Sequence, residues 1–140
     1  MTVVAEQLGD APHVPLVVIA DDDADIRRLV EVAAGRAGAI VGANVADGLA
    51  ALEAIRELRP DLAILDVSMP GMDGLDVCRA VRAEDGMRGT KILLLSAAVH
   101  PEAIKAGRLA GADLYGQKPF RLKVLQEQIL GLLSIQLSAR

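Results

Sequence analysis

Short apolar segments alternate with amphipathic stretches along this chain, and that alternation limits the possible folds more than any other feature. Apolar residues recur at steps of three and four in the amphipathic stretches, as Leu49, Leu52 and Ile55 do, which is typical of helices that bury one face. The pattern predicts five strand–helix units. The expected strands are residues 16–20, 39–41, 62–65, 92–95 and 113–115.

Residues that end helices fall where this alternation requires them. Gly38 follows the first helical stretch, Pro60 closes the second and Gly111 follows the fourth. Strands that crossover helices cover on both faces are apolar almost throughout, as these are. We therefore predict an α/β fold with a doubly wound, five-stranded parallel sheet, five helices and the flavodoxin-like strand order 2-1-3-4-5.

The 140 residues match one domain of this kind, which is large enough to fold without disulfides or a structural metal. Residues 1–14 show no periodicity, so we predict a flexible N-terminal extension there and a folded domain over residues 15–137. His13, in the extension, is expected to face solvent. Tyr115 and Phe120 are the only aromatic residues, which predicts an aliphatic core, and the helical spacing of Cys78 places it in that core.

Charge and hydropathy narrow the expected partners and compartment. The net charge of -4 argues against nucleic acid as a direct partner, because binding phosphates needs clustered Lys and Arg. Arg27 and Arg28 are interpreted as a solvated helix face. No apolar run approaches the roughly 20 residues of a membrane span, and the N-terminus lacks the order of a signal peptide. We expect a cytoplasmic protein that contacts neither nucleic acid nor membrane.

Polar side chains gather where the predicted strands end. The carboxyl ends of parallel strands share one edge of the sheet, where ligands bind. Asp61 begins a strand and should lie at the opposite edge, and Asp23 is expected to cap the first helix. In the predicted strand order Asp66 is central. The polar residues at this edge are Asp21, Asp22, Asp23, Asp66, Ser96 and Lys118.

The acidic residues at this edge predict a magnesium site. Neighbouring carboxylates raise one another's pKa, so they need a compensating cation to stay ionised. Oxygen ligands at a shallow, wet edge favour Mg²⁺, which together with Lys118 would balance the charges of Asp21, Asp22 and Asp66. An ionised Asp66 could then attack a phosphoryl donor in line, with Lys118 and the Ser96 hydroxyl holding the equatorial oxygens.

These motifs, in this order, resemble those of response-regulator receiver domains over residues 16–133. The resemblance implies that Asp66 is the phosphoacceptor and that Lys118 binds the phosphoryl group. It also implies that Asp21, Asp22 and the backbone carbonyl of Ser68 hold Mg²⁺ together with Asp66. The matching segments are Val-Val-Ile-Ala-Asp-Asp-Asp at 17–23, Ala-Asp-Gly at 46–48, Leu-Asp-Val-Ser-Met-Pro-Gly-Met-Asp-Gly at 65–74, Leu-Leu-Ser-Ala at 94–97 and Lys-Pro-Phe at 118–120.

The same resemblance implies how the domain would signal. Ser96 matches the switch hydroxyl, Tyr115 matches the switch aromatic, and the bond before Pro119 is expected to be cis. Phosphorylation would shift the packing of the face made by the fourth helix, fifth strand and fifth helix. The implied donor is a sensor histidine kinase or histidine phosphotransfer protein, and the downstream protein target is unknown.

Within this family, the chain would be a stoichiometric phosphoacceptor, not an enzyme that turns over a substrate, and a monomer or phosphorylation-dependent dimer. It would catalyse its own phosphorylation and dephosphorylation. Ser68 and Ala98 stand where other receivers often carry amide or acidic groups that orient the attacking water. We therefore expect slow self-dephosphorylation.

Three other functions fit parts of the pattern. A magnesium-dependent phosphohydrolase with an Asp nucleophile usually needs a second acid two residues later, where Asp66 is followed by Val67 and Ser68. A nucleotide- or flavin-binding module would need a glycine-rich loop after the first strand, where this chain has three aspartates. A receiver that only docks, without accepting phosphate, would not need Asp66, Lys118 and the metal acids together.

Overall fold

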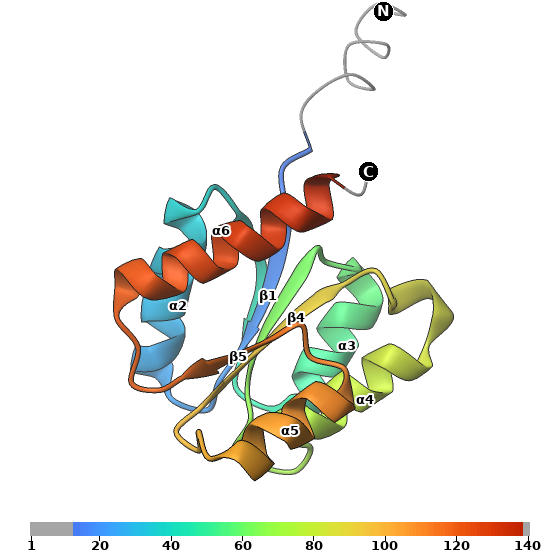
Figure 1. Cartoon of the computed structure of the whole chain (residues 1–140). Coiled ribbons are helices and arrows are strands. Elements are labelled where there is room, and N and C mark those ends of the chain that lie inside the picture. The colour runs from blue at the N-terminus through green and yellow to red at the C-terminus, as the bar shows by residue number, and fades with distance from the viewer. Residues whose placement is uncertain (1–12, 139–140) are drawn as a thin grey trace, which may run out of the picture.

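Five parallel strands form one sheet at the centre of the molecule (Figure 1). The computed structural model describes residues 13–138. The strand order is β2-β1-β3-β4-β5 and every neighbouring pair is parallel, which confirms the predicted doubly wound α/β fold. The strands are β1 (Leu16–Ala20), β2 (Ile40–Val45), β3 (Leu62–Asp66), β4 (Lys91–Ser96) and β5 (Leu114–Gln117).

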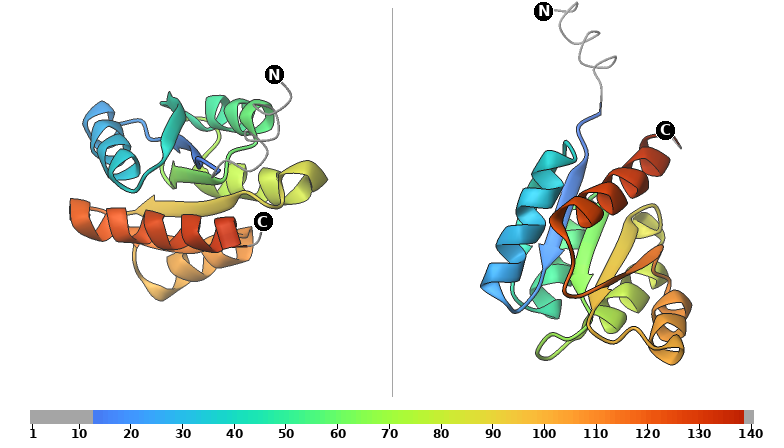
Figure 2. Two further views of the ribbon diagram at one scale, coloured as in Figure 1. Left: turned by 90° about the horizontal axis from the view of Figure 1, so that it is seen from above. Right: turned by 60° about the vertical axis from the view of Figure 1, so that its left-hand side comes forward.

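Helices cover both faces of the sheet (Figure 2). Side chains of α2 and α6 pack on one face, and those of α3, α4 and α5 pack on the other. Val17 and Ile19 point to the first layer and Val18 and Ala20 to the second, so β1 is apolar on both faces. No helix among the described residues is long and apolar enough to cross a membrane. The helices are α2 (Ala24–Arg36), α3 (Gly48–Leu58), α4 (Gly74–Ala83), the 3₁₀ helix η1 (Asp85–Met87), α5 (Pro101–Ala110) and α6 (Leu122–Ser138).

Aspartate side chains fix where three of these helices begin. Asp23, Asp47 and Asp73 are the N-cap residues of α2, α3 and α4, and each accepts hydrogen bonds from backbone N–H groups of the first turn. Asp76 completes a capping box with Asp73. A cap of this kind contributes about 1 kcal/mol to stability. The prediction that Asp23 caps the first helix is confirmed.

The second strand and the surroundings of His13 differ in part from the sequence predictions. The second strand extends to Val45 rather than ending at residue 41, because an edge strand alternates exposed and half-buried residues and need not be continuously apolar. Residues 1–12 of the predicted extension lie outside the described residues. His13 is exposed, as expected, but its Nε2 also lies 2.8 Å from Oδ2 of Asp61, at the edge where the strands begin.

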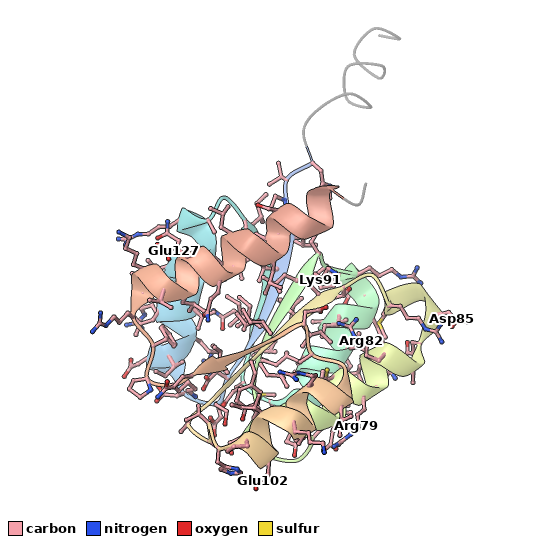
Figure 3. All side chains as sticks on the ribbon, in the orientation of Figure 1. Arg79, Arg82, Asp85, Lys91, Glu102 and Glu127 are labelled. Carbon is pink, nitrogen blue, oxygen red and sulfur yellow. The ribbon has the colours of Figure 1, made fainter. Side chains whose placement is uncertain are left out.

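Arg82 ties together the loops at this amino edge of the sheet (Figure 3). Its guanidinium, on α4, donates hydrogen bonds to the backbone oxygens of Gly111, Arg88 and Thr90 over 2.7–3.1 Å. It also pairs with Asp113 Oδ2 at 2.8 Å. These contacts join α4 to the segments that lead into β4 and β5.

Candidate functional site

A cleft opens at the carboxyl edge of the sheet, where β1, β3, β4 and β5 end. Asp21 directly follows β1, Asp66 ends β3, Ser96 ends β4 and Lys118 directly follows β5. The parallel strand order therefore brings together residues that are far apart in sequence, as predicted. The residues that line the cleft include Asp22, Asp23, Asp66, Ser68, Ser96, Ala97, Ala98 and Lys118.

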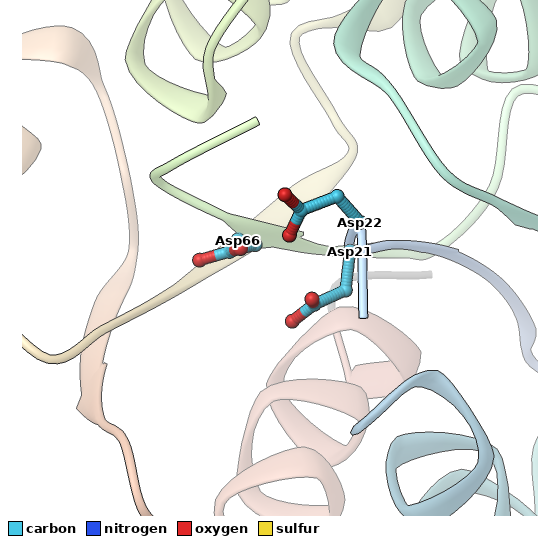
Figure 4. A group of neighbouring side chains, drawn as sticks. All are labelled: Asp21, Asp22 and Asp66. Carbon is cyan, nitrogen blue, oxygen red and sulfur yellow. The ribbon is translucent and has the colours of Figure 1, made fainter. Parts of the chain in front are cut away.

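Three carboxylates converge in this cleft (Figure 4). One oxygen each from Asp21, Asp22 and Asp66 lies within 4.8 Å of the others. Asp21 and Asp66 are only 2% and 4% exposed, whereas Asp22 is exposed. Hard oxygen donors that are partly buried and partly open to water suit Mg²⁺, which binds one or two carboxylates and retains several waters. The residues present thus fit the metal that the sequence predicts.

Lys118 links the two buried acids. Its Nζ lies 3.0 Å from Oδ2 of Asp21 and 3.3 Å from Oδ1 of Asp66. The Lys118 backbone N–H donates to the Ser96 carbonyl oxygen at 2.9 Å, and the bond to Pro119 is cis, as expected. The ammonium is therefore delivered to the carboxylates from a backbone that is tied to the end of β4.

The surroundings of Asp66 shift its acid–base equilibrium toward the neutral form. Burial raises the pKa of the Asp66 carboxyl, and the nearby charge of Asp21 raises it further, while Lys118 and the Ser68 N–H oppose the shift. Burial also disfavours the charged form of Lys118, but its hydrogen bond to Asp21 and the charges of Asp66 and Asp21 outweigh burial and raise its pKa. The ammonium does not offset the combined effects of burial and of Asp21 on the pKa of Asp66, so the cleft favours a further cation.

Backbone hydrogen bonds hold the acids in place. The N–H of Asp23 donates to Asp21 Oδ1 at 2.9 Å, and the N–H of Ser68 donates to Asp66 Oδ1 at 3.3 Å. Arg27 Nη1 donates to the carbonyl oxygen of Asp21 at 2.8 Å. The interpretation of Arg27 as part of a solvated face missed this contact, because residue spacing does not predict which way a long side chain turns.

The two proposed switch residues both contact the backbone of Ala98. Ser96 Oγ accepts a hydrogen bond from the Ala98 N–H at 3.0 Å, and Tyr115 Oη donates one to the Ala98 carbonyl oxygen at 2.6 Å. The Tyr115 ring lies against Gly107 of α5, where an added Cβ would be 2.6 Å from Cδ2 of the ring. The loop after β4 is thus connected to both the cleft and the outer face of β5.

This strand order, with acids and a lysine at the carboxyl edge, is that of two-component signalling domains. Residues 17–130 match the family described as Response regulator receiver domain. The chain belongs to this family and is the receiver domain of a two-component response regulator, which confirms the resemblance seen in the sequence.

Relatives in other organisms agree with this assignment. The chain is 39% identical over 113 residues to the DNA-binding response regulator MtrA of Mycobacterium tuberculosis, covering 81% of this chain and 48% of MtrA. It is 40% identical over 126 residues to the transcriptional regulatory protein CseB of Streptomyces coelicolor, covering 90% of this chain and 51% of CseB. The chain thus spans about half the length of these relatives.

Solved structures show the same fold. The chemotaxis response regulator CheY4 of Vibrio cholerae is 32% identical and has a TM-score of 0.79, over 86% of this chain and 99% of CheY4. The receiver domain of the Francisella response regulator 1452 is 30% identical with a TM-score of 0.76, over 86% of this chain and 98% of that domain. The likeness therefore covers nearly the whole of each solved domain.

The expectation that nucleic acid is excluded as a partner is wrong. MtrA is a DNA-binding response regulator and CseB is a transcriptional regulatory protein. That expectation rested on the net charge of -4, which describes only the residues that are counted. It gives no information on the half of these relatives that this chain does not match.

Proposed function

We propose that this domain is a phosphorylation switch in which Asp66 accepts a phosphoryl group from a phosphohistidine of a kinase or phosphotransfer protein. The observation that carries the proposal is the position of Asp66. It is a buried carboxylate at the centre of the edge, 3.3 Å from the Lys118 ammonium and within 4.8 Å of two other acids. A cytoplasmic location, expected from the sequence, stays a prediction.

The chemistry requires an ionised nucleophile and counter-charges for the phosphoryl oxygens. An oxygen of Asp66 would form the new bond to phosphorus, while the bond from phosphorus to the donor nitrogen breaks and that nitrogen keeps the electron pair. Lys118 would then hold one phosphoryl oxygen and the Ser96 hydroxyl another. Asp21, Asp22, Asp66 and the Ser68 carbonyl would hold Mg²⁺, which would supply the remaining positive charge. Burial and Asp21 raise the pKa of Asp66. A cation in the cleft would lower this pKa again and so favour the ionised carboxylate.

The contacts of Ala98 suggest how the signal would leave the cleft. To reach a phosphoryl group on Asp66, Ser96 Oγ must turn away from the Ala98 N–H that it now binds at 3.0 Å. The carbonyl of the same residue holds Tyr115 Oη at 2.6 Å. A movement of this loop would therefore change the packing of Tyr115, and with it the face made by α5, β5 and α6.

The phosphoryl group should be long-lived. Ser68 and Ala98 flank the cleft, and neither side chain is a carboxylate or an amide that could orient an attacking water strongly. We therefore propose slow self-catalysed dephosphorylation. Position 68, two residues after Asp66, is a serine and not an acid. This also argues against a phosphohydrolase that hydrolyses substrate repeatedly.

Phosphorylation with a small donor tests the proposal directly. The protein is incubated with Mg²⁺ and acetyl phosphate, and intact mass is measured for the wild type, Asp66→Asn and the control Asp85→Asn, which changes a side chain 92% exposed in η1. We expect one added phosphoryl group in the wild type and the control, and none in Asp66→Asn. Phosphorylation that persists in Asp66→Asn would refute the assignment.

The relatives suggest the output to examine first. MtrA and CseB are named as regulators that bind DNA or control transcription. We propose that a protein carrying this domain controls transcription in response to phosphorylation of Asp66. Transcript levels in cells that carry the wild type or Asp66→Asn would test this, and identical transcript profiles under inducing conditions would contradict it.

A further inference from the structure

Arg27 reaches from α2 back to the loop that carries the metal acids. Its Nη1 donates to the carbonyl oxygen of Asp21 at 2.8 Å, six residues earlier in the chain. That carbonyl belongs to the peptide group that joins Asp21 to Asp22. The guanidinium therefore contacts the peptide group between the two residues whose carboxylates lie near Asp66.

The Asp21 carbonyl lies past the last paired residue of β1. The last residue pair between β1 and β2 joins Ala20 to Val45, and the Asp21 N–H still donates to the Val45 oxygen at 3.1 Å. The Asp21 side chain is fixed by the Asp23 N–H and by Lys118. The carbonyl of Asp21 accepts its hydrogen bond from the Arg27 side chain, one residue after the pairing of β1 with β2 ends.

We propose that Arg27 is a positioning residue for the metal site: it holds the Asp21–Asp22 peptide group so that both carboxylates face Asp66. The inference rests on the proposed function, because it concerns Mg²⁺ at that site. Arg27 acts through the backbone and does not itself contact the metal. Mg²⁺ demands near-ideal octahedral geometry, so a small rotation of two ligands weakens its binding.

The positive charge of Arg27 has the opposite effect, because a guanidinium near the cleft repels a cation. The side chain is partly exposed, so solvent and salt screen this repulsion. The hydrogen bond acts at 2.8 Å on the peptide itself and is not screened in the same way. Positioning therefore outweighs repulsion, and the sign of the change in Mg²⁺ affinity separates the two effects.

Calorimetric titration of the unphosphorylated protein with Mg²⁺ alone tests the inference. Loss of a hydrogen bond that orients metal ligands costs about tenfold or more in affinity, so we expect the Kd of Arg27→Ala to rise about tenfold. Arg27→Lys, which keeps the charge and one donor nitrogen, should recover part of the affinity. The control Arg28→Ala removes the exposed neighbouring arginine and should leave the Kd unchanged. An unchanged or lower Kd in Arg27→Ala would overturn the proposal.

Two further measurements separate folding and function from positioning. Arg27→Gln removes the charge with less change in size, so if Arg27→Ala does not fold, a weaker Kd in Arg27→Gln supports positioning and a tighter Kd overturns it. In phosphorylation by acetyl phosphate, the half-saturating Mg²⁺ concentration should rise in Arg27→Ala while the rate at saturating Mg²⁺ stays near that of the wild type. A wild type that is not phosphorylated refutes the proposed function, whereas variants that match a phosphorylated wild type refute only the role of Arg27.

Discussion

Neutralising Asp66 should stabilise the domain when no divalent cation is present. Two carboxylates within 4.8 Å repel by about 3.5 kcal/mol at an effective dielectric constant of about 20, and an ammonium at 3.3 Å attracts by about 5 kcal/mol. Asp66 has two such acidic neighbours and one such ammonium, and its burial adds a further cost to the charge. After screening by solvent and salt, we expect Asp66→Asn to gain about 1 kcal/mol in the free energy of unfolding.

The pH dependence of stability predicts the same sign for the difference in the free energy of unfolding between the wild type and Asp66→Asn. Because the pKa of Asp66 is raised, the native state keeps this proton at pH values where the unfolded chain has released it. From the ordinary value of 3.8 up to the raised native value, the free energy of unfolding of the wild type therefore falls as pH rises. Asp66→Asn has no carboxyl at this position, so its free energy of unfolding does not fall for this reason as pH rises. The two proteins should be close in stability below this window, and the variant should be more stable above it.

Thermal and urea denaturation in EDTA, followed by circular dichroism, measure the effect. A gain of about 1 kcal/mol corresponds to about 4 °C in Tm for a domain of this size. Added Mg²⁺ should raise the Tm of the wild type more than that of the variant. Asp85→Asn, at an exposed position, should change stability by less than about 0.5 kcal/mol. If Asp66→Asn is less stable than the wild type in EDTA at neutral pH, the electrostatic reasoning is wrong.

Three other substitutions test the surroundings of the site. Ser68→Asn should speed loss of the phosphoryl group about tenfold by orienting the attacking water, as label release would show, and an unchanged rate would contradict that role. Gly107→Ala should displace the Tyr115 ring and cost about 1–2 kcal/mol, seen by urea denaturation and by the fluorescence of the single tyrosine; unchanged emission would show that the ring stays in place. Arg82→Ala should cost about 2–4 kcal/mol in urea denaturation, and Arg82→Lys should not restore it because one ammonium cannot span the same carbonyl groups; full rescue by lysine would contradict this.

The sheet and the position of the site could be predicted because both follow from simple periodic rules. Apolar segments identified the buried strands, and parallel strands necessarily end at the same edge. Asp21, Asp66, Ser96 and Lys118 could therefore be placed together although they come from four different strands. The predicted strand order indicated their proximity and a phosphoryl-transfer chemistry, and the family resemblance added the Ser68 ligand and the switch residues, which experiments must now test.

The features that sequence reasoning missed depend on side-chain direction and on contacts at long range. The later residues of β2 include Gly42 and Asn44, which are poor strand formers, and their pairing with β1 overrides that local preference. The contact between His13 and Asp61 joins residues 48 positions apart, so no local pattern indicates it. The hydrogen bond from Arg27 depends on a rotamer that helical periodicity does not specify.

Asp61 and Asp66 show why burial alone does not identify a functional acid. They lie five residues apart, Asp61 directly before β3 and Asp66 at its last position, and are 3% and 4% exposed. Asp61 Oδ2 accepts a hydrogen bond from the Leu16 N–H and lies beside His13, each at 2.8 Å, so its carboxylate joins the start of β1 to that of β3. Asp66 instead faces two more acids across an open cleft, where folding leaves negative charge without full compensation. A buried carboxylate that is bonded to a neighbouring strand, like Asp61, holds strands together. One that lacks full compensation, like Asp66, favours binding of a cation and then of a phosphoryl group.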